Sequence, residues 1–520
     1  MNIKVFNRFT NAKEIDNKFD NKKEVLEKFN EQEYLHSVKP GNENKGGIPL
    51  IYEKNKVYVN SSEDHTIIFG STGSGKSRYL IMPLICNLAK NGENIVVFDV
   101  KGELFETTSG MLKEQGYNVK VFNLKDPSKS NRFSFFHYPY HLIKDDPNNQ
   151  NNIDKGEEML KDIASSLLDQ KGRNQNDPYW DNIAESLLLG CMLAMIHNAT
   201  CEEECNFNNL SDLIRSTNEI IDKDDDESYK RDNWLRIYFD NLPVDSTIRQ
   251  NLASTLELKA PNTLGCVVSS ALKLVDLFTS SKSIQNLLSE VEIDFYDFND
   301  PEKKTVLYVI VPDEKETYNG VFSMLIKQLY ETLMYALSTS SKQKLDRRIN
   351  FVLDEFANIP RISNVCTMLS ASRSRNVRFF IVLQNNSQLI SKYGNCDANT
   401  IKYNCQNWIF LNTKDEDILN DIVQRVGIDP LTNKEAITKR DLQLLKKEIP
   451  YVKALVFTQD TNPFVTTLLD ISFYKELFND DGSLAYSSLN ITNNNINNMK
   501  LFKARDFWER CACGGEPLRR

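Results

Sequence analysis

The chain has 520 residues, of which 40% are hydrophobic and 26% charged, as is usual for a globular protein of several domains. Its formal net charge of −9 excludes a molecule that is basic throughout, so any contact with DNA needs a locally basic surface. No apolar run reaches the roughly twenty residues of a transmembrane helix, and ten scattered cysteines in a chain of this size favour reduced thiols in a cytoplasm.

The N-terminal arm, residues 1–46, is rich in Lys, Glu and Asn. We expect a loosely packed, partly disordered segment with a weak amphipathic helix at residues 22–29, and an arm that docks on a partner is the alternative. Apolar residues at 50–52 and 57–59 then predict a hairpin that leads into the next domain.

A phosphate-binding loop follows this hairpin. Residues 70–77 match the pattern G-x-x-x-x-G-K-[ST] between a predicted strand at 66–69 and a predicted helix at 78–89, kinked at Pro83. Glycines leave room for backbone N–H groups around the phosphates, the lysine can reach the β- and γ-phosphates, and the final serine can bind Mg²⁺. The residues expected to bind ATP are Gly70, Ser71, Thr72, Gly73, Ser74, Gly75, Lys76 and Ser77.

Strands predicted at residues 94–99 and 118–123 flank a helix predicted at 103–115. This alternation is typical of a doubly wound parallel sheet. Asp99 lies at the carboxyl end of its strand and is followed by Lys101. Their charges can face a ligand or form a salt-bridged loop, and both interpretations remain open.

Residues 145–288 are predicted to be all-α, since apolar residues recur there at three- and four-residue spacing. The predicted helices are residues 157–168, 180–196, 210–221, 229–239 and 246–278, the last interrupted by Pro261. His197, Cys201 and Cys205 would share one face if the second helix continued, which makes a weak candidate metal site.

The sheet resumes with a strand predicted at residues 305–311, a helix at 321–337 and an apolar strand that ends in Asp354 and Glu355. Downstream of a phosphate-binding loop, this acidic pair predicts the second half of an ATPase site. The aspartate would hold the hydration shell of Mg²⁺, and the glutamate would orient and deprotonate the attacking water.

Gln384 ends the next predicted strand, residues 378–383, which follows a predicted helix at 362–372. Its amide could bond the γ-phosphate and report hydrolysis, or it could only cap the strand. The surrounding segment is locally basic, with Arg361, Arg373, Arg375, Arg378, Lys392 and Lys402 against Asp397. Such a stretch could face nucleic acid, a neighbouring subunit's phosphates, or only solvent.

The remaining predicted elements are strands at residues 407–413 and 455–458, the latter the last strand, and a helix at 415–426. An Asn-rich linker at residues 490–498 leads to a short final helix at 499–510.

These elements predict an α/β protein, a RecA-like P-loop motor ATPase core with an inserted all-α domain. Such motors usually work as rings in which a neighbour's arginine completes each site. The predicted division is a polar arm (1–46), the first part of the nucleotide-binding core (47–144), the all-α insertion (145–288), the second part of the core (289–475), and the Asn-rich linker with its C-terminal helix (476–520).

Several short sequence blocks indicate a particular protein family in addition to nucleotide binding. Besides the loop, they are residues 98–104 (FDVKGEL), 351–360 (FVLDEFANIP), 372–375 (SRSR) and 383–389 (LQNNSQL). Together they resemble the TraG-type coupling proteins of conjugative type IV secretion, over residues 47–460. The chain departs from that family in three ways: it has no N-terminal transmembrane helices, it has Val100 where proline is usual, and residues 131–135 replace a Trp-Asn-Pro segment.

The resemblance implies a hexameric ATPase that links the DNA-processing relaxosome to the secretion channel. The all-α domain would receive a relaxase or accessory protein, and Arg373, rather than Arg375, would act in trans on a neighbour's site. The predicted catalytic residues are thus Lys76, Glu355, Gln384 and Arg373, and the predicted Mg²⁺ ligands are Ser77 and Asp354. We expect a cytoplasmic protein, docked at the inner face of the membrane only through a partner.

Two rival functions remain. One is an ATP-switched receptor for protein substrates without DNA translocation, which the acidic charge and the lack of a membrane anchor favour. The other is a different RecA-like DNA-pumping ATPase, which would predict a winged-helix tail that the C-terminus does not offer.

Overall fold

The computed structural model divides the chain into two compact units. Unit 1 comprises Met1–Lys125, Phe295–Glu316 and Leu333–Ile491, and unit 2 comprises Asp126–Asp294, Thr317–Thr332 and Thr492–Arg520. The residues that the structure describes are 4–5, 30–33, 45–53, 56–171, 179–218, 234–258, 261–312, 318–362, 364–429, 433–445, 447–459, 461–492 and 499–512. The helix predicted at residues 22–29 and most of the Asn-rich linker lie outside the described residues.

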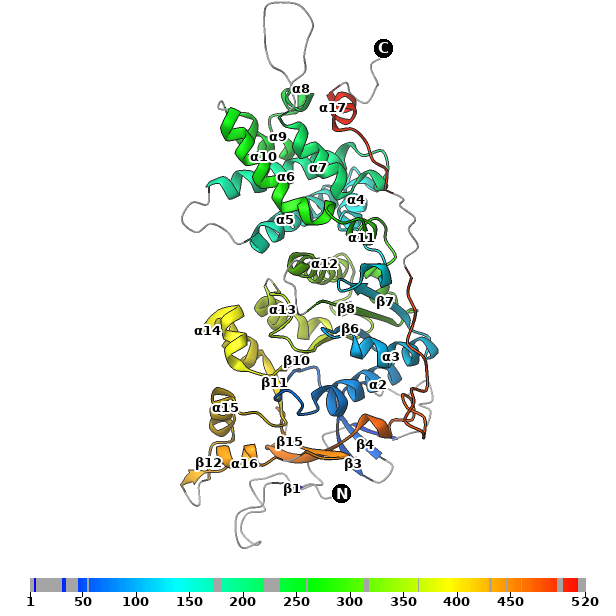
Figure 1. Cartoon of the computed structure of the whole chain (residues 1–520), viewed down its shortest axis with the longest axis vertical. Coiled ribbons are helices and arrows are strands. Elements are labelled where there is room, and N and C mark those ends of the chain that lie inside the picture. The colour runs from blue at the N-terminus through cyan, green and yellow to red at the C-terminus, as the bar shows by residue number, and fades with distance from the viewer. Residues whose placement is uncertain are drawn as a thin grey trace, which may run out of the picture. The chain divides into compact units, whose positions relative to one another are not determined.

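Unit 1 is built on an 11-stranded sheet in the order β1-β16-β15-β11-β5-β10-β9-β6-β8-β7, with β14 paired to β15 (Figure 1). The strands from β11 to β7 are parallel, and β15, β16 and β1 extend the sheet antiparallel. The strands of this sheet are β1 (Lys4–Val5), β5 (His65–Phe69), β6 (Asn94–Phe98), β7 (Asn118–Asn123), β8 (Thr305–Ile310), β9 (Ile349–Leu353), β10 (Val377–Leu383), β11 (Cys405–Phe410), β14 (Lys447–Glu448), β15 (Tyr451–Phe457) and β16 (Phe464–Leu469).

The central strands form because their apolar, largely β-branched and aromatic sequences can be buried on both faces, as a parallel sheet requires. Every residue of β5, β6, β8, β9 and β10 is buried. Figure 1 shows α2 and α3 on one side of the sheet and α13 and α14 on the other. The helices of unit 1 are η1 (Ser77–Ile81), α2 (Met82–Lys90), α3 (Glu103–Glu114), α13 (Val365–Ser372), α14 (Asn386–Asn404), α15 (Glu416–Val426) and α16 (Lys439–Gln443), and α12 (Asn319–Ser338) begins in unit 2 and ends in unit 1.

The structure corrects the predictions at both ends of unit 1. Two short pieces of the N-terminal arm pair as strands: β1 joins β16, and β2 (Asn30–Glu33) joins the hairpin of β3 (Ile48–Glu53) and β4 (Lys56–Asn60). Residues 455–458 are not the last strand, because β16 follows and pairs with β15. A further small pair joins β12 (Ile428–Asp429) to β13 (Lys434–Glu435).

Unit 2 consists of helices in its described residues. They are α4 (His137–Lys144), α5 (Gln150–Lys171), α6 (Tyr179–Asn198), α7 (Phe207–Ser216), α8 (Trp234–Asn241), α9 (Thr247–Leu256), α10 (Pro261–Thr279), α11 (Lys282–Leu287) and α17 (Ala504–Ala512). Helix α9 ends at Leu256 and α10 begins at Pro261, so the predicted interruption is confirmed. Proline disrupts the interior of a helix but is tolerated in its first turn. The C-terminal helix α17 packs in this unit, where the Trp508 indole donates to the Ser216 hydroxyl at 2.8 Å.

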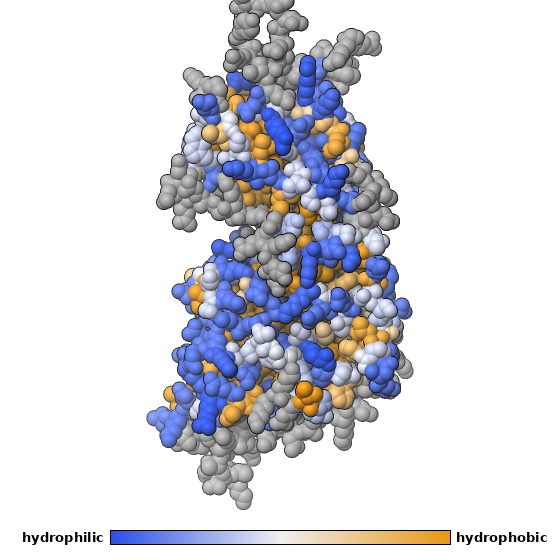
Figure 2. Space-filling view, viewed as in Figure 1, coloured by the Kyte–Doolittle hydropathy of each residue, from blue (hydrophilic) through white to orange (hydrophobic). Residues whose placement is uncertain are grey.

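The most continuous apolar run of the chain belongs to the core of unit 2. Residues 187–196 of α6 are all buried, and α6 contacts α5, α7, α9 and α10. Within the described residues, no helix is both long and apolar enough to cross a bilayer. The face drawn in Figure 2 is largely hydrophilic, with hydrophobic residues scattered among the polar ones.

A buried ionic cluster ties together the amino ends of β6, β9 and β10. Glu93 accepts hydrogen bonds from the Asn350 amide at 2.8 Å and from the Arg378 guanidinium at 3.3 Å. Arg378 also donates to the Asn350 carbonyl oxygen at 2.7 Å, and its side chain is only 2% exposed. Lys402 is buried as well and pairs with Asp421 at 2.7 Å. The basic stretch predicted between residues 361 and 402 is therefore not one exposed surface.

We predict that Arg378→Leu destabilises unit 1 by about 3–5 kcal/mol, because it removes the cation nearer to the buried Glu93 carboxylate and leaves only Arg348, at 3.7 Å. Arg375→Leu is the matched control, since that guanidinium bonds one backbone carbonyl, of Ala371 at 2.7 Å. Chemical denaturation of the two variants compares the losses. Equal losses in both variants would contradict the structural role of the Arg378–Glu93 pair.

Candidate nucleotide site

The loop after β5 has the backbone of a phosphate cradle. The Gly70 N–H donates to the Leu383 carbonyl at 3.1 Å, which fixes the start of the loop to the end of β10. A Cβ at Gly70 would lie 2.5 Å from the Ser74 hydroxyl, so any other residue there would displace the Ser74 side chain. Gly73 and Gly75 have φ values of +78° and +95°, a region that favours glycine. The loop thus favours glycine at each of these positions.

Lys76 is buried beneath this cradle. Its ammonium donates to the carbonyls of Gly70 at 2.7 Å and Ser71 at 3.1 Å. Burial lowers the pKa of Lys76, while the nearby carboxylates of Asp354 and Glu355 oppose that change. When a triphosphate binds, the Lys76 ammonium can exchange these two neutral carbonyl acceptors for charged phosphate oxygens, which form stronger hydrogen bonds.

Two further features of the loop suit a phosphate. The Ser74 hydroxyl is buried and has no hydrogen-bond partner, which is rare for a buried polar group unless a ligand supplies the partner. The helix that follows begins with the π-helical turn η1 and continues as α2, and Pro83 lies in the first turn of α2.

The helix predicted after the loop is confirmed. A π-helical turn precedes Pro83, where the sequence predicted a kink.

Asp354 and Glu355 follow β9, two strands from the loop. Burial raises the pKa of Asp354 to about 7, helped by the neighbouring Glu355 charge and opposed by Lys76. Glu355 has φ of +50°, a left-handed conformation that is uncommon for a side chain of this kind. Such backbone strain is found where the surrounding structure fixes a functional group.

Gln384 joins the two halves of the site. It ends β10, which pairs in parallel with β5 on one side and β9 on the other. The Thr72 hydroxyl donates to its amide oxygen at 2.8 Å, and its amide nitrogen donates to Glu355 at 2.9 Å. The prediction that Gln384 lies beside the phosphate loop is confirmed, and its role in sensing phosphate stays a prediction.

Two further side chains hold Glu355. The sequence left open whether Lys101 faces a ligand or forms a salt bridge, and it gave Asn358 no role. Lys101 pairs with one carboxylate oxygen at 3.3 Å, and the Asn358 amide donates to the other at 3.0 Å. Asn358 could have been suspected, since it lies three residues after Glu355. Asp99 does not reach this group: it accepts from the backbone N–H groups of Gly102 and Phe105, both at 2.8 Å, and so caps α3.

Arg373 lies at the opposite edge of the sheet. It begins the short turn η6 (Arg373–Arg375), which precedes β10, and pairs with Asp64 at 2.9 Å just before β5. The five residues of β5 separate the two edges by roughly 16 Å. Arg373 therefore cannot complete the phosphate site of its own chain.

The metal site considered at His197, Cys201 and Cys205 is wrong. Helix α6 ends at Asn198, because the Glu204 carboxylate accepts from the Thr200 backbone N–H at 2.9 Å and closes a turn. His197 instead pairs with Glu157 at 3.0 Å. The Cys205 thiol is buried, whereas Cys201 is partly exposed. Within the described residues these three side chains do not form a group that could hold a metal ion.

The assembled site fits a nucleoside triphosphate with its divalent cation. The loop offers backbone N–H groups, a lysine and an unpartnered hydroxyl for phosphate oxygens. The Ser77 hydroxyl and the Asp354 carboxylate are oxygen ligands of the kind that Mg²⁺ prefers. Glu355, held by three donors, is placed to act on water, so the arrangement can perform phosphoryl transfer to water.

Comparison with known proteins identifies the family of this chain. Residues 8–447 match the model of the family described as type IV secretory system conjugative DNA transfer. The chain belongs to this family. Curated relatives are the VirD4 proteins of Rhizobium radiobacter and Agrobacterium fabrum, each 22% identical over 373 residues, which are 71% of this chain. The chain spans about half the length of these relatives, at 49% and 50% of them respectively.

Solved structures show the fold of this member of the family. The coupling protein TrwBΔN70 has a TM-score of 0.56 at 14% identity, over 83% of this chain and 89% of that one. TrwB in complex with a non-hydrolysable ATP analogue has a TM-score of 0.54 at 17% identity, over 79% and 86% respectively. At these identities the likeness establishes the fold alone: a RecA-like α/β core with an all-α domain, as predicted.

We predict that Lys76→Ala weakens nucleotide binding by about 100-fold or more, because it removes a charge-assisted contact to the phosphates. Lys90→Ala is the control on the same helix, since Lys90 pairs with Glu476 at 2.9 Å. Fluorescence titration with a labelled nucleotide measures both affinities. Unchanged affinity in Lys76→Ala would contradict the position of the triphosphate.

Proposed function

We propose that this protein is an ATP-hydrolysing coupling protein that drives relaxase-bound DNA to a type IV secretion channel during conjugation. The observation that carries the proposal is the convergence of Lys76, Asp354, Glu355 and Gln384 at the carboxyl ends of adjacent parallel strands, in a chain of the conjugative DNA transfer family. TrwB binds an ATP analogue in one structure, and ADP with Mg²⁺ in another. ATP and Mg²⁺ are accordingly the proposed substrate and cofactor.

The hydrogen bonds around Glu355 suggest how hydrolysis is controlled. Residues 70–77 bind the triphosphate, and Ser77 and Asp354 hold Mg²⁺, which bridges phosphate oxygens and neutralises their charge. Lys101 and Asn358 keep the Glu355 carboxylate oriented, so that it can take a proton from the attacking water.

Gln384 is the switch in this scheme. Its amide N–H group now bonds Glu355, and an arriving γ-phosphate offers the same N–H group a more strongly charged acceptor. Thr72 fixes the amide orientation by donating to its oxygen. Gln384 and Lys101 contact the same Glu355 oxygen, Oε1, so transfer of the amide to the phosphate removes one of its two donors and opens that side of the oxygen to water. Loss of phosphate would reverse the change at the end of β10.

Arg373 belongs in this proposal to a neighbouring subunit's site. Its side chain is 54% exposed and pairs with one carboxylate, of Asp64, so it can move to a phosphate presented by another chain. A homo-hexameric ring with identical head-to-tail interfaces would bring the two edges of the sheet together. In that arrangement ATP hydrolysis in one subunit would be coupled to the position of Arg373 in the next subunit.

Membership of the family suggests the remaining partners. Unit 2 is the proposed receptor for a relaxase or accessory protein, and channel components would hold the ring at the inner face of the membrane. The division proposed from the sequence, a core in two parts (47–144 and 289–475) around an all-α insertion (145–288), stays a proposal. The nucleotide site lies in unit 1. The rival function, a receptor switched by ATP without DNA translocation, predicts hydrolysis that is indifferent to DNA.

We predict that purified protein hydrolyses ATP faster when single- or double-stranded DNA is added at low salt, where phosphate contacts are strongest. Glu355→Gln should bind ATP normally and lose about 10²–10⁴-fold in turnover, because the general base is gone. Glu103→Gln, an exposed glutamate at the start of α3, is the control. An ATP hydrolysis rate that does not change when DNA is added would favour the ATP-switched receptor. Normal turnover in Glu355→Gln would refute the role of Glu355 as general base.

A mixing experiment tests the shared site. Lys76→Ala lacks a functional loop and Arg373→Ala lacks the arginine, so each alone should be inactive. Mixed in equal amounts, they should restore roughly a quarter of the sites in a head-to-tail ring, where an intact loop meets an intact arginine. No recovery in mixed rings, or full activity of Arg373→Ala alone, would show that Arg373 does not act in trans.

A further inference from the structure

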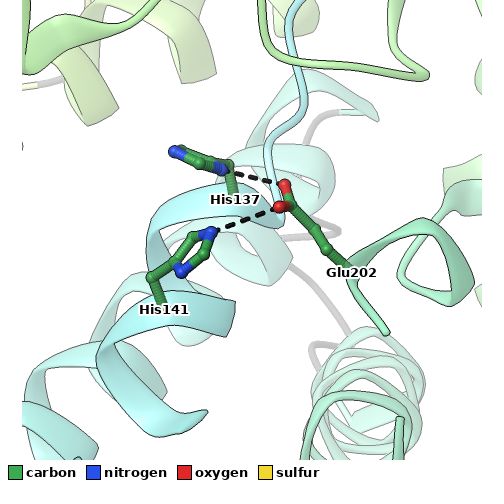
Figure 3. A group of neighbouring side chains, drawn as sticks. All are labelled: His137, His141 and Glu202. Atoms are coloured by element: carbon green, nitrogen blue, oxygen red, sulfur yellow. Dashed lines mark hydrogen bonds and ion pairs between the residues drawn. The ribbon is translucent and has the colours of Figure 1, made fainter. Parts of the chain in front are cut away.

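A second group of chemically competent side chains lies in unit 2, apart from every residue of the nucleotide site. His137 and His141 occupy positions i and i+4 of α4 and so share one face of that helix. Glu202 reaches them from the short turn η3 (Glu202–Glu204), which follows α6. Figure 3 shows both imidazole rings beside the two oxygens of the Glu202 carboxylate.

The distances are those of a compact ligand set. The His137 Nδ1 lies 2.8 Å from one Glu202 oxygen, and the His141 Nε2 lies 3.2 Å from the other. One ligand atom from each residue can be chosen so that all three lie within 4.8 Å of one another. Zinc bonds of about 2.0–2.1 Å in tetrahedral geometry would place such atoms about 3.4 Å apart. Small side-chain rotations therefore suffice to admit an ion.

Three imidazole nitrogens of this group contact carboxylate oxygens. Both ring nitrogens of His141 face carboxylates, because its Nδ1 lies 3.0 Å from an Asp145 oxygen. Together with the His137 contact, three imidazole nitrogens face carboxylate oxygens, whereas two neutral imidazoles carry only two N–H groups. A metal ion bound by His137 Nδ1 and His141 Nε2 would satisfy this arrangement and leave the His141 Nδ1–H to donate to Asp145.

The surroundings of His141 resemble those of a metal ligand. In metal sites the second nitrogen of a ligating histidine usually donates to a carboxylate, which fixes the tautomer and the ring orientation. Asp145, one turn further along α4, occupies that position relative to His141. The His141 side chain is 41% exposed, so an ion can enter from solvent. Glu204, two residues after Glu202 in the same turn, is already paired with Lys500 and Arg510.

We propose that His137, His141 and Glu202 bind a divalent transition-metal ion of the zinc class, with Asp145 supporting His141. Two imidazoles and one carboxylate are a known protein ligand set for zinc, and the fourth position would hold water. The ion would fasten the turn between α6 and α7 to helix α4. Its role is structural, within the helical unit, and it is independent of the proposed ATP hydrolysis.

The test uses the full-length chain, stripped with a chelator and dialysed into metal-free buffer. Zinc is added back and counted per chain by mass spectrometry, and Co²⁺ is added separately so that its absorption spectrum reports the coordination geometry. We expect about one zinc per chain in the wild type, with tetrahedral or five-coordinate cobalt bands. Thermal unfolding should move to higher temperature with zinc, because the ion binds the folded state.

Variants assign the ion to these residues. His141→Asn and Glu202→Gln should lose the bound zinc, and Asp145→Asn should weaken zinc binding by about 10- to 100-fold, as supporting carboxylates do. His197→Asn is the matched control, since it breaks a different histidine–glutamate pair of the same unit, with Glu157. It should keep the zinc and the thermal shift.

The opposite results would overturn the proposal. If the wild type binds no zinc and its unfolding temperature does not respond, the three side chains form only hydrogen bonds and ion pairs with one another. If zinc binds equally to His141→Asn, Glu202→Gln and the wild type, the ion lies elsewhere. Should one variant fail to fold, Asp145→Asn still decides, because its exposed side chain can change without leaving a buried charge, and unchanged zinc affinity there contradicts the site.

Discussion

The parallel pairing of β5, β10 and β9 is the constraint on which the nucleotide site depends. In-register pairs such as Ile381 with Ile67 and with Leu353 bring the ends of three chain segments to one edge of the sheet. The phosphate loop, Gln384 and the Asp354–Glu355 pair all follow these strands directly. Because β10 lies between the other two strands, Gln384 is the one of these groups that bonds both halves of the site.

The same sheet separates functions by its two edges. Phosphate-binding groups gather where the parallel strands end, as is general for such sheets. At the amino edge, the Glu93–Arg378–Asn350 cluster fixes the strands to one another, and exposed Arg373 lies nearby with Asp64. A subunit with a loop at one edge and an arginine at the other is suited to a ring in which each site is shared.

Local sequence predicted much of this arrangement, and the errors have physical causes. Apolar strands and the glycine-rich loop were foreseen because burial on both faces and close phosphate approach restrict the residue types. Counting charges between Arg361 and Lys402 failed because charge alone does not reveal burial, and Arg378 is buried by partners distant in sequence. The group of His137, His141 and Glu202 was missed for the same reason, since the glutamate is more than 60 residues away and joins them only through the packing of helices.

The most direct test of the account is an experimental structure of the full chain with Mg²⁺ and a non-hydrolysable ATP analogue. The account predicts that the triphosphate lies on residues 70–77 and that Lys76 leaves the carbonyls of Gly70 and Ser71 for phosphate oxygens. It also predicts that the Gln384 amide moves from Glu355 to the γ-phosphate. An analogue bound elsewhere, or Lys76 and Gln384 still on their present partners with the phosphates in place, would contradict it.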